Sequence, residues 1–392
     1  MSEPNVDRVR ILHTSDWHLG RSFHREGLLD AQAVFIDHLV QTARSERVDL
    51  VAVSGDIYDR ALPSVDAVEL CNEALARLAA TGARVVLISG NHDSATRLGF
   101  GSRLIDAAGI HLRTDPRSCG TPVLLADEHG PVAVYAIPYL EPDSVRTVLD
   151  CDEGGHGPVI AAAMRHVRAD LVKRPETTRS VALAHAFVTG ASTCESERDI
   201  SVGGASAVAP SVFDGIDYVA LGHLHGAQVV SDAMRYSGSP VAYSFSEEHH
   251  HKGMWLVDLP TQRASAPDVE FVATPVPRPL KRLRGRLDDL LADPGPGQFC
   301  DHYLQVTLTD PVRPRGAMDR LRRRFPHVLV LGFEPQDDAA EAPSSYASRL
   351  RGRSDIEVAD DFVTHVRTSP EAAETELFQR AFESVRQVEA NA

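Results

Sequence analysis

The sequence predicts an α/β fold built on a mostly parallel β-sheet, followed by a smaller α+β domain and C-terminal helices. Three observations lead to this prediction. Short apolar runs alternate with longer segments of helical periodicity over the first 110 residues, polar motifs directly follow such runs, and the composition changes near residue 275. Alternation of this kind is typical of βαβ units.

The first domain is expected to span residues 1–275. Its strands are predicted where β-branched and other apolar residues form short runs, at 9–13, 50–54, 85–89, 132–137, 181–184 and 218–221. Helices are predicted over longer segments with helical periodicity, at 28–48, 64–80 and 159–171. Further short strands are expected to complete the layer, at 228–230, 234–236, 254–257 and 269–272.

A proline-rich run at 275–279 predicts a hinge, and a basic segment follows it. Residues 276–335 contain 11 Lys and Arg against 7 Asp and Glu, within a chain of net charge −15. Strand and helix patterns alternate along this segment, at 280–283, 288–292, 303–307, 318–325 and 328–331. We therefore expect residues 276–335 to form a small α+β domain with a basic surface.

Residues 336–392 are expected to form a linker and two helices. The linker is predicted at 336–345, which is rich in Asp, Ala, Glu, Pro and Ser, and the helices at 356–366 and 371–388. The second helix would carry one apolar face, made by Leu377, Phe378, Ala381, Phe382 and Val385. Such a face needs a surface to cover it, which is either a partner protein or the chain's own second domain.

Composition argues against several classes of protein. The five cysteines are scattered and form no Cys-x-x-Cys pair, which is typical of reduced thiols in the cytoplasm. The first eight residues carry charges of both signs, and no apolar stretch approaches the roughly 18 residues of a membrane span. We therefore expect a cytoplasmic protein with no membrane segment. The acidic net charge predicts weak binding to DNA unless basic patches, metal ions or a partner supply the attraction.

Five short polar motifs supply nine oxygen or imidazole-nitrogen donors. They are Asp16-Trp17-His18, Gly55-Asp56, Gly90-Asn91-His92-Asp93, Ala184-His185 and Gly222-His223-Leu224-His225. Each motif directly follows a predicted strand, which is where open α/β sheets place their ligand sites. The set therefore predicts a ligand centre at the carboxyl ends of the strands.

The donor types predict a centre of two divalent cations. Cleavage of a phosphate ester needs an activated water and neutralised charge on the phosphoryl oxygens, and two cations roughly 3.5 to 4 Å apart can supply both. Asp56 is the candidate for the carboxylate shared by the two cations. One cation would be held by Asp16, His18, Asp56 and His225, and the other by Asp56, Asn91, His185 and His223. Mixed carboxylate, amide and imidazole donors without sulfur favour Mn²⁺, Fe²⁺ or Zn²⁺ over Mg²⁺, and we expect Mn²⁺.

His92 remains outside this predicted ligand set, although it is adjacent to the ligand Asn91. It is the candidate for the general acid that protonates the leaving oxygen, or for a clamp on the transition-state phosphate. Asp93 is expected to orient the His92 ring. The predicted catalytic residues are therefore His92 and Asp93.

The sequences of these motifs resemble those of the calcineurin-like binuclear metallophosphoesterases. Within that family they are most similar to those of the nuclease subunits that work with an ATPase of the SbcC type. The similarity is carried by Ser15-Asp16-Trp17-His18-Leu19-Gly20, Gly55-Asp56-Ile57-Tyr58-Asp59, Gly90-Asn91-His92-Asp93-Ser94, Ala220-Leu221-Gly222-His223-Leu224-His225 and Tyr236-Ser237-Gly238-Ser239-Pro240. Asp59 is a departure, since archaeal and eukaryotic relatives often have histidine there.

The resemblance implies a layered metallophosphoesterase sandwich in which residues 276–335 form a DNA-capping domain. It implies a 3′→5′ exonuclease on double-stranded DNA ends, and an endonuclease that opens hairpins when the SbcC-type ATPase is engaged. It also implies that the last helices dock on that ATPase, and that the chain forms a homodimer within a nucleoid-associated heterotetramer.

Two other functions stay open at this level. A phosphatase or small-molecule phosphodiesterase of the same fold would use the same cations. Cleavage of a small ester, however, would not require a basic second domain or an apolar C-terminal helix. A non-catalytic tether for DNA ends would not be expected to keep His92 and Asp93 beside a full ligand set.

Overall fold

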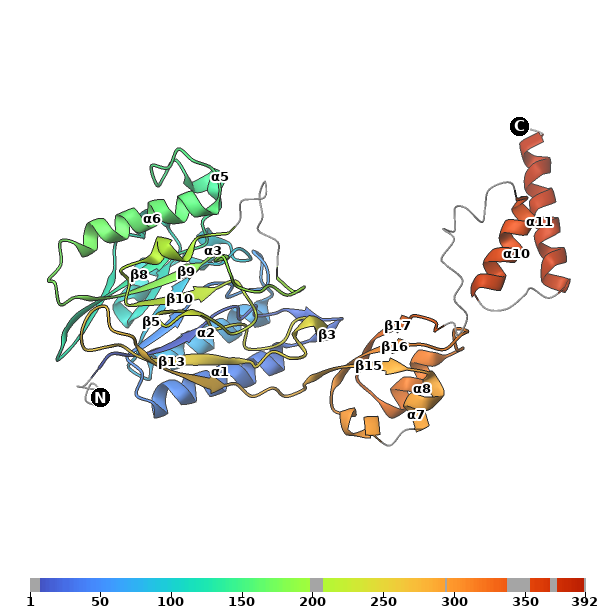
Figure 1. Ribbon diagram of the computed structural model, residues 1–392, viewed down its shortest axis with the longest axis horizontal. Coiled ribbons are helices and arrows are strands. Elements are labelled where there is room, and N and C mark those ends of the chain that lie inside the picture. The colour runs from blue at the N-terminus through green and yellow to red at the C-terminus, as the bar shows by residue number, and fades with distance from the viewer. Residues whose placement is uncertain (1–7, 198–206, 293–294, 337–352, 367–371, 391–392) are drawn as a thin grey trace. The chain divides into compact units, whose positions relative to one another are not determined.

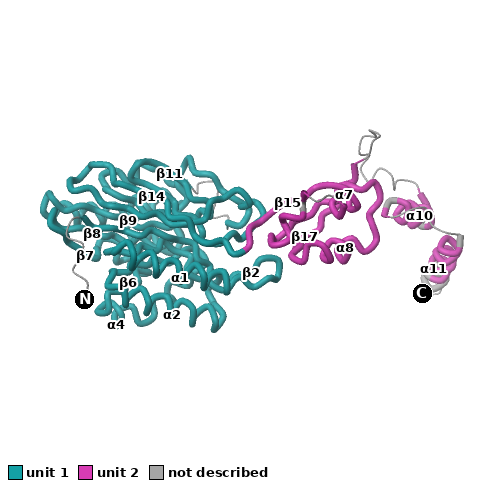
Figure 2. The backbone as a smooth tube through the Cα atoms, turned by 90° about the horizontal axis from the view of Figure 1, so that it is seen from below, with its two compact units in different colours: residues 1–277 teal, residues 278–392 magenta. Residues whose placement is uncertain are grey.

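The structure is a computed structural model that describes residues 8–197, 207–292, 295–336, 353–366 and 372–390 (Figure 1). The chain separates into two compact units, Met1–Pro277 and Arg278–Ala392 (Figure 2). The predicted division into domains 1–275, 276–335 and 336–392 stays a prediction. None of the described helices has the length and apolar character needed to cross a membrane.

Unit 1 contains two six-stranded sheets, where the sequence predicted one mostly parallel sheet. The first has the order β14-β13-β1-β4-β5-β6, with bounds Asp268–Ala273, Gly253–Asp258, Arg10–Thr14, Leu50–Val53, Arg84–Ile88 and Ile110–Arg113. The second has the order β11-β12-β10-β9-β8-β7, with bounds Gln228–Ser231, Met234–Tyr236, Tyr218–Gly222, Arg179–His185, Gly130–Ile137 and Val123–Asp127. Four neighbouring strands of each sheet are parallel, namely β1-β4-β5-β6 and β12-β10-β9-β8.

Helices cover the outer face of each sheet, which gives a four-layer sandwich. Leu12 and Val51 of the first sheet face a core shared with Phe35 and Leu78 of the covering helices α1 (Leu29–Ser45) and α2 (Val65–Ala79). The second sheet packs in the same way on α6 (His156–Leu171). Alternate residues of both sheets, such as Ile11 and Leu183, form the core between them. Strands buried on both faces explain why the predicted strands are continuous apolar runs.

The remaining regular segments of unit 1 are short. They are the strands β2 (Ser22–Phe23) and β3 (Glu26–Gly27), the helices α3 (Ala95–Leu98), α4 (Ser102–Ile105) and α5 (Pro142–Val145), and 3₁₀ turns at Asp106–Ala108, Pro116–Ser118, Pro210–Phe213 and Phe245–Glu247. The strands β6 and β7, of four and five residues, were not predicted from the sequence. The four short strands predicted after residue 227 divide between the two sheets instead of extending one layer.

A buried ion pair lies at the edge of the sandwich where the parallel strands begin. The guanidinium of Arg179, at the start of β9, donates to both carboxylate oxygens of Asp127, and both side chains are buried. Asp127 also accepts a hydrogen bond from the backbone N–H of Val9, just before β1, at 2.9 Å. This pair therefore connects the second sheet to the first at that edge.

Unit 2 contains a three-stranded parallel sheet of order β15-β16-β17, at Leu280–Gly285, Tyr303–Leu308 and Val328–Phe333. The helices α7 (Leu287–Ala292) and α8 (Ala317–Arg324) share its apolar core, which includes Leu304, Leu321 and Phe325, and a 3₁₀ turn spans Gly295–Phe299. Strand, helix, strand, helix, strand is the order predicted from the sequence.

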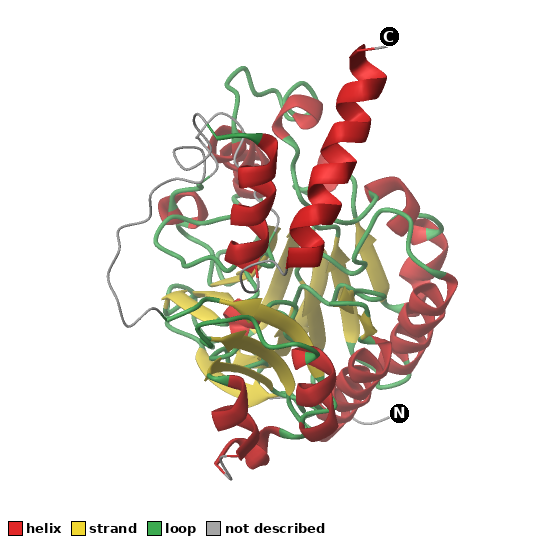
Figure 3. Cartoon of the chain, turned by 90° about the vertical axis from the view of Figure 1, so that its right-hand side faces the viewer, coloured by secondary structure: helices red, strands yellow, loops and turns green. Residues whose placement is uncertain are grey.

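Two helices end the chain, α10 (Asp355–Val366) and α11 (Ala372–Ala390), and they contact each other. The long helix leading to the C-terminus in Figure 3 is α11. Both helices were predicted. Apart from Gln336, the predicted linker at 336–345 lies outside the described residues.

Candidate metal centre

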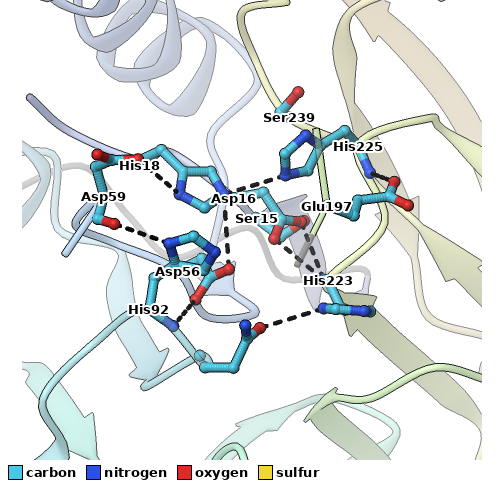
Figure 4. A network of polar contacts seen from close by, with 12 residues as sticks. Ser15, Asp16, His18, Asp56, Asp59, His92, Glu197, His223, His225 and Ser239 are labelled. Atoms are coloured by element: carbon cyan, nitrogen blue, oxygen red, sulfur yellow. Dashed lines mark hydrogen bonds and ion pairs between the residues drawn. The ribbon is translucent and has the colours of Figure 1, made fainter. Parts of the chain in front are cut away.

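The five motifs converge at one edge of unit 1 because each follows a parallel strand. Those after β1, β4 and β5 come from the first sheet, and those after β9 and β10 from the second. The structure brings together all seven predicted metal ligands: Asp16, His18, Asp56, Asn91, His185, His223 and His225. Figure 4 labels five of them, Asp16, His18, Asp56, His223 and His225. Six of them are buried, and Asn91 is partly exposed.

The backbone is strained at several of these residues. Among the described residues, nine non-glycine residues have a positive φ, and four of the nine are the predicted ligands Asp16, His18, Asp56 and His223. Left-handed backbone is unfavourable for residues with a Cβ, and where it persists it clusters at functional sites. The strain therefore marks the same residues that the motifs predicted.

One group of donors surrounds His18. Its Nε2 lies 3.1 Å from Nε2 of His225 and 3.5 Å from Oδ2 of Asp56. Asp16, His18 and His225 place ligand atoms within 4.8 Å of one another, which is a spacing that a single cation could use. This is the first ligand group predicted from the sequence.

A second group of donors surrounds Asn91. Its Oδ1 lies 2.9 Å from Nε2 of His185 and 3.2 Å from Nδ1 of His223. His185 donates its Nδ1–H to the carbonyl of Ser54 at 2.9 Å, so Nε2 of the neutral ring carries a lone pair. Two acceptors, Oδ1 of Asn91 and Nε2 of His185, therefore face each other at hydrogen-bond distance. A shared cation would satisfy both of them.

Carboxylates lie between the two groups. Oδ2 of Asp56 is 3.5 Å from Nε2 of His18 and 3.6 Å from Nε2 of His185, which is the position a bridging carboxylate requires. Asp16 also falls in both groups, since it clusters with His18 and His225 and again with Asp56 and His185. The bridging role of Asp56 stays a prediction.

Glycine is required beside the ligands because there is no room for a side chain. A Cβ on Gly55 would lie 2.4 Å from Nδ1 of His185, and one on Gly90 would lie 2.1 Å from Oδ1 of Asp56. A Cβ on Gly222 would lie 1.9 Å from the carbonyl oxygen of Ser54. The glycines of three motifs thus allow loops from both sheets to approach closely.

Burial controls the charge of the centre. Desolvation lowers the pKa of His185, and it lowers the pKa of His18 and His223 well below the ordinary value, so these rings are neutral at neutral pH. Burial, followed by the nearby charge of Asp56, raises the pKa of Asp16. Neutral imidazoles and crowded carboxylates form a set of electron-pair donors that suits a divalent cation.

Asp93 does not act on His92 as predicted. Its carboxylate accepts hydrogen bonds from the backbone N–H groups of Ile57, Tyr58 and Gly90, at 2.9 to 3.0 Å. The ring of His92 instead donates from Nδ1 to the carbonyl of Asp59 at 2.8 Å. Asp93 therefore holds the loops after β4 and β5 together, and the carbonyl of Asp59 orients the ring.

The groups that support His225 were not predicted from the sequence. Its Nδ1 lies 2.7 Å from Oγ of Ser196, and that hydroxyl donates to Oε1 of Glu247 at 2.6 Å. Glu247 forms a buried ion pair with Lys252. Both side chains are buried. A Glu and a Lys five positions apart gave no signal that they would be buried.

Two family models match the chain. The model described as calcineurin-like phosphoesterase matches residues 9–227, which is more than half of the chain. The model described as type 5 capsule protein repressor C-terminal domain, named for SbcD, matches residues 276–386. The second match begins at residue 276, where the composition of the sequence changes.

Several solved structures are similar to part of the chain. TT1561 of Thermus thermophilus is 13% identical, with a TM-score of 0.40, and the match covers 68% of this chain and 100% of that one. GAP50, the anchor in the inner membrane complex of Plasmodium, is 12% identical, with a TM-score of 0.40 and coverage of 68% and 85%. A dimetal phosphatase from Danio rerio is 16% identical, with a TM-score of 0.42 and coverage of 69% and 98%. At this level of identity none of the three indicates a substrate.

Proposed function

The chain belongs to the calcineurin-like phosphoesterase family, and on that basis we propose that it is a Mn²⁺-dependent DNA nuclease. Its reactions would be 3′→5′ exonuclease cleavage of double-stranded ends and endonuclease cleavage of hairpins and single strands. It would act with an SbcC-type ATPase in processing double-strand breaks and hairpins. The match of residues 276–386 to the SbcD C-terminal model supports a subunit of the SbcD type.

The observation that carries the proposal is the pair of donor groups joined by Asp56 and Asp16. Two divalent cations bound there would activate a water and neutralise the charge on the phosphoryl oxygens. Asp16, His18, Asp56 and His225 would hold one of them. The other would be held by Asp56, Asn91, His185 and His223. We take Mn²⁺ as the metal because the donors are oxygens and imidazole nitrogens.

His92 would complete the reaction at the partly exposed edge of the centre. Its backbone N–H donates to Oδ1 of Asp56 at 2.8 Å, which ties the residue to the metal ligands. Its Nδ1–H is held by the carbonyl of Asp59, so Nε2 is the ring atom that can exchange a proton. When the ring is protonated, Nε2–H could protonate the leaving oxygen or donate to a phosphoryl oxygen.

The basic surface of unit 2 supports DNA as the substrate. Its arginines are largely exposed to solvent, including Arg282, Arg284, Arg286, Arg313, Arg315, Arg320, Arg322 and Arg323. Phosphate contacts by such groups dominate affinity for DNA, and a chain of net charge −15 needs a local patch of this kind. We propose that residues 276–335 cap the DNA.

Exposed apolar side chains support protein partners. On α10 and α11, Phe362 and Leu377 are 54% and 59% exposed, which suits docking on an SbcC-type ATPase. In unit 1, Leu62, which precedes α2, is 66% exposed, Val65 at the start of α2 is 72% exposed, and Phe100 is 88% exposed. These residues would support pairing of two chains, and hence a heterotetramer with two ATPase subunits.

One assay tests the proposal. The purified chain is incubated with Mn²⁺ and a 5′-labelled blunt duplex, a hairpin or p-nitrophenyl esters, and EDTA provides the metal-free control. The nuclease proposal predicts release of mononucleotides from the duplex. Ester cleavage without DNA cleavage would replace it with a phosphatase or small phosphodiesterase. Retention of DNA ends without cutting would replace it with a tether.

A further inference from the structure

Asp59 lies against two imidazole rings of the centre. Its Oδ1 is 3.9 Å from Nδ1 of His18, and its backbone carbonyl accepts the hydrogen bond from Nδ1 of His92. The two rings meet edge to face, with their centroids 4.6 Å apart. One residue therefore contacts both a predicted metal ligand and the predicted proton donor (Figure 4).

Two of the other candidate ligand histidines, His185 and His225, show what the ring nitrogen that faces away from the centre does, whereas His223 turns its Nδ1 toward Asn91. Nδ1 of His185 is held by the carbonyl of Ser54, and Nδ1 of His225 by the hydroxyl of Ser196. Such partners fix the ring tautomer and orientation, and a carboxylate in this position is common for metal-bound histidine. Each contact leaves Nε2 with its lone pair toward the centre.

His18 differs from His185 and His225. Its Nδ1 is buried and has no hydrogen bond to any residue that the structure describes. A buried ring N–H without a partner is costly, so a nearby acceptor would be favoured. The gap to Oδ1 of Asp59 exceeds a charge-assisted hydrogen bond of about 2.7 to 2.9 Å by only about 1 Å.

Neighbouring cations hold the Asp59 carboxylate in this position. Nε of Arg21 lies 3.6 Å from Oδ1, and Nη2 of Arg60 lies 3.4 Å from Oδ2. Arg21 is itself fixed, because Nη2 donates to the carbonyl of Ser196 at 3.0 Å and the guanidinium stacks on the ring of Tyr243. The carboxylate is thus restrained within reach of His18.

We propose that Asp59 is a positioning residue that fixes two imidazoles at once. Its carboxylate accepts the Nδ1–H of His18, which directs the Nε2 lone pair of that ring toward the first cation, while its main-chain carbonyl orients His92. The inference rests on the proposed function, because it assigns His18 to a metal. It also gives a role to the aspartate that stands where other relatives have histidine.

The test separates the side chain of Asp59 from its carbonyl. Asp59→Ala removes the carboxylate but keeps the carbonyl, so it should leave His92 in place and affect His18. Mn²⁺ binding is measured by calorimetry on the full chain. We expect about 10- to 100-fold weaker binding of one of the two ions, with the other little changed. Asp59→Asn, whose amide oxygen can still accept Nδ1–H, should recover most of that loss.

A second readout needs no metal. ¹⁵N-detected NMR of the imidazoles in the metal-free protein should find His18 in the Nδ1–H tautomer, and a tautomer mixture in Asp59→Ala. The matched control is Asp37→Ala, an identical change of charge at a side chain that is 66% exposed on α1. It should change neither Mn²⁺ binding nor the His18 tautomer.

The outcomes distinguish the two proposals. If the unaltered chain binds no Mn²⁺, the proposed function fails. If it binds two ions and Asp59→Ala binds both with unchanged affinity, with the His18 tautomer also unchanged, the role of Asp59 is wrong and the nuclease proposal stands. Unfolding curves for the metal-free variants check that each is folded.

Discussion

Nε2 of His18 and Nε2 of His225 lie 3.1 Å apart, although the two residues are separated by 207 positions in the sequence. Ser196 donates its hydroxyl proton to Glu247, so it accepts from Nδ1–H of His225, and Nε2 of the neutral ring is then an acceptor. Burial keeps the pKa of His18 well below its ordinary value, so its ring carries a single proton. With that proton on Nδ1, as proposed, two lone pairs face each other across the contact. The arrangement suits two rings that share one cation.

Replacement of His92 tests the proposed proton transfer separately from metal binding. His92→Ala should bind Mn²⁺ nearly as well as the unaltered chain, because the ring is not in either ligand group. Exonuclease turnover should fall about 10²- to 10⁴-fold, which is the usual contribution of a general acid. His129→Ala, at a partly exposed turn before β8, is the matched control and should leave turnover unchanged. Near-normal turnover of His92→Ala would show that His92 is not the general acid.

Replacement of Asp56 tests whether the two ion sites share a ligand. Asp56→Asn keeps the size of the side chain and an acceptor for the N–H of His92, but it removes the charge between the two groups. Both Mn²⁺ ions should bind more weakly, by at least about 10-fold each. Asn91→Ala is the comparison, since it should weaken the second ion and spare the first. Two ions bound to Asp56→Asn with full affinity would exclude a bridging role.

Gly55 and Gly82 form a matched pair for testing the close approach of the loops. Both have positive φ, +94° and +92°, so alanine at either position should cost about 1 to 2 kcal/mol of stability through the backbone. Only Gly55→Ala would also push a Cβ to 2.4 Å from Nδ1 of His185, whereas Gly82 has nothing within 4 Å. Calorimetry should therefore find Mn²⁺ affinity reduced in Gly55→Ala and unchanged in Gly82→Ala. Equal Mn²⁺ affinity in the two variants would contradict the steric argument.

The Arg179–Asp127 pair predicts a pH-dependent stability of unit 1. Burial acts to raise the pKa of Asp127, but it is outweighed by the hydrogen bonds and charge of Arg179 together with hydrogen bonds from the backbone N–H groups of His129 and Val9, and the pKa lies below its usual range. The stabilisation is therefore present above the unfolded pKa of about 3.9 and is lost as the pH falls through the folded value. Asp127→Asn leaves a buried guanidinium without its counter-charge and should cost about 3 to 5 kcal/mol near neutral pH.

Denaturation with urea, followed by tryptophan fluorescence, measures this effect, because Trp17 and Trp255 both lie in unit 1. The difference between Asp127→Asn and the unaltered chain should be large at about pH 7 and should narrow below about pH 4. Asp115→Asn, at an exposed ion pair with Arg117, serves as the control and should not move the midpoint. A difference that does not vary with pH would contradict the ion-pair explanation.

The exposed face of α11 predicts where the partner binds. Leu377→Glu places a charge on a side chain that is 59% exposed, so the fold should tolerate it. Co-purification with an SbcC-type ATPase should be lost, while Mn²⁺-dependent nuclease activity of the isolated chain should be unchanged. Gln379→Glu adds the same charge at an exposed neighbour and should retain the partner. If both variants bind the ATPase normally, the docking surface lies elsewhere.

The sequence predicted the fold and the clustering of the candidate ligands better than the contacts that support them. Each ligand sits in a short motif directly after an apolar strand, so local pattern was enough to place Asp16 or His223. The supporting contacts join distant segments. Ser196 reaches His225 only because the loop after β9 returns to the end of β10, and Asp93 bonds the loop after β4 in place of the adjacent His92. The spacing of residues along the chain does not predict which distant side chains will form hydrogen bonds with each other.

The ligands are divided between the two sheets: Asp16, His18, Asp56 and Asn91 follow strands of one, while His185, His223 and His225 belong to the other. Bound cations would therefore link the two sheets at the edge where the parallel strands end. The Arg179–Asp127 ion pair lies at the opposite edge, where the parallel strands begin. Removing the cations would leave only hydrogen bonds between the described residues of the two layers at the edge that holds the candidate ligands, such as the one from His185 to the carbonyl of Ser54, while the opposite edge kept its ion pair. Chelation of the cations should then lower the local stability of unit 1 first in the loops that carry the candidate ligands.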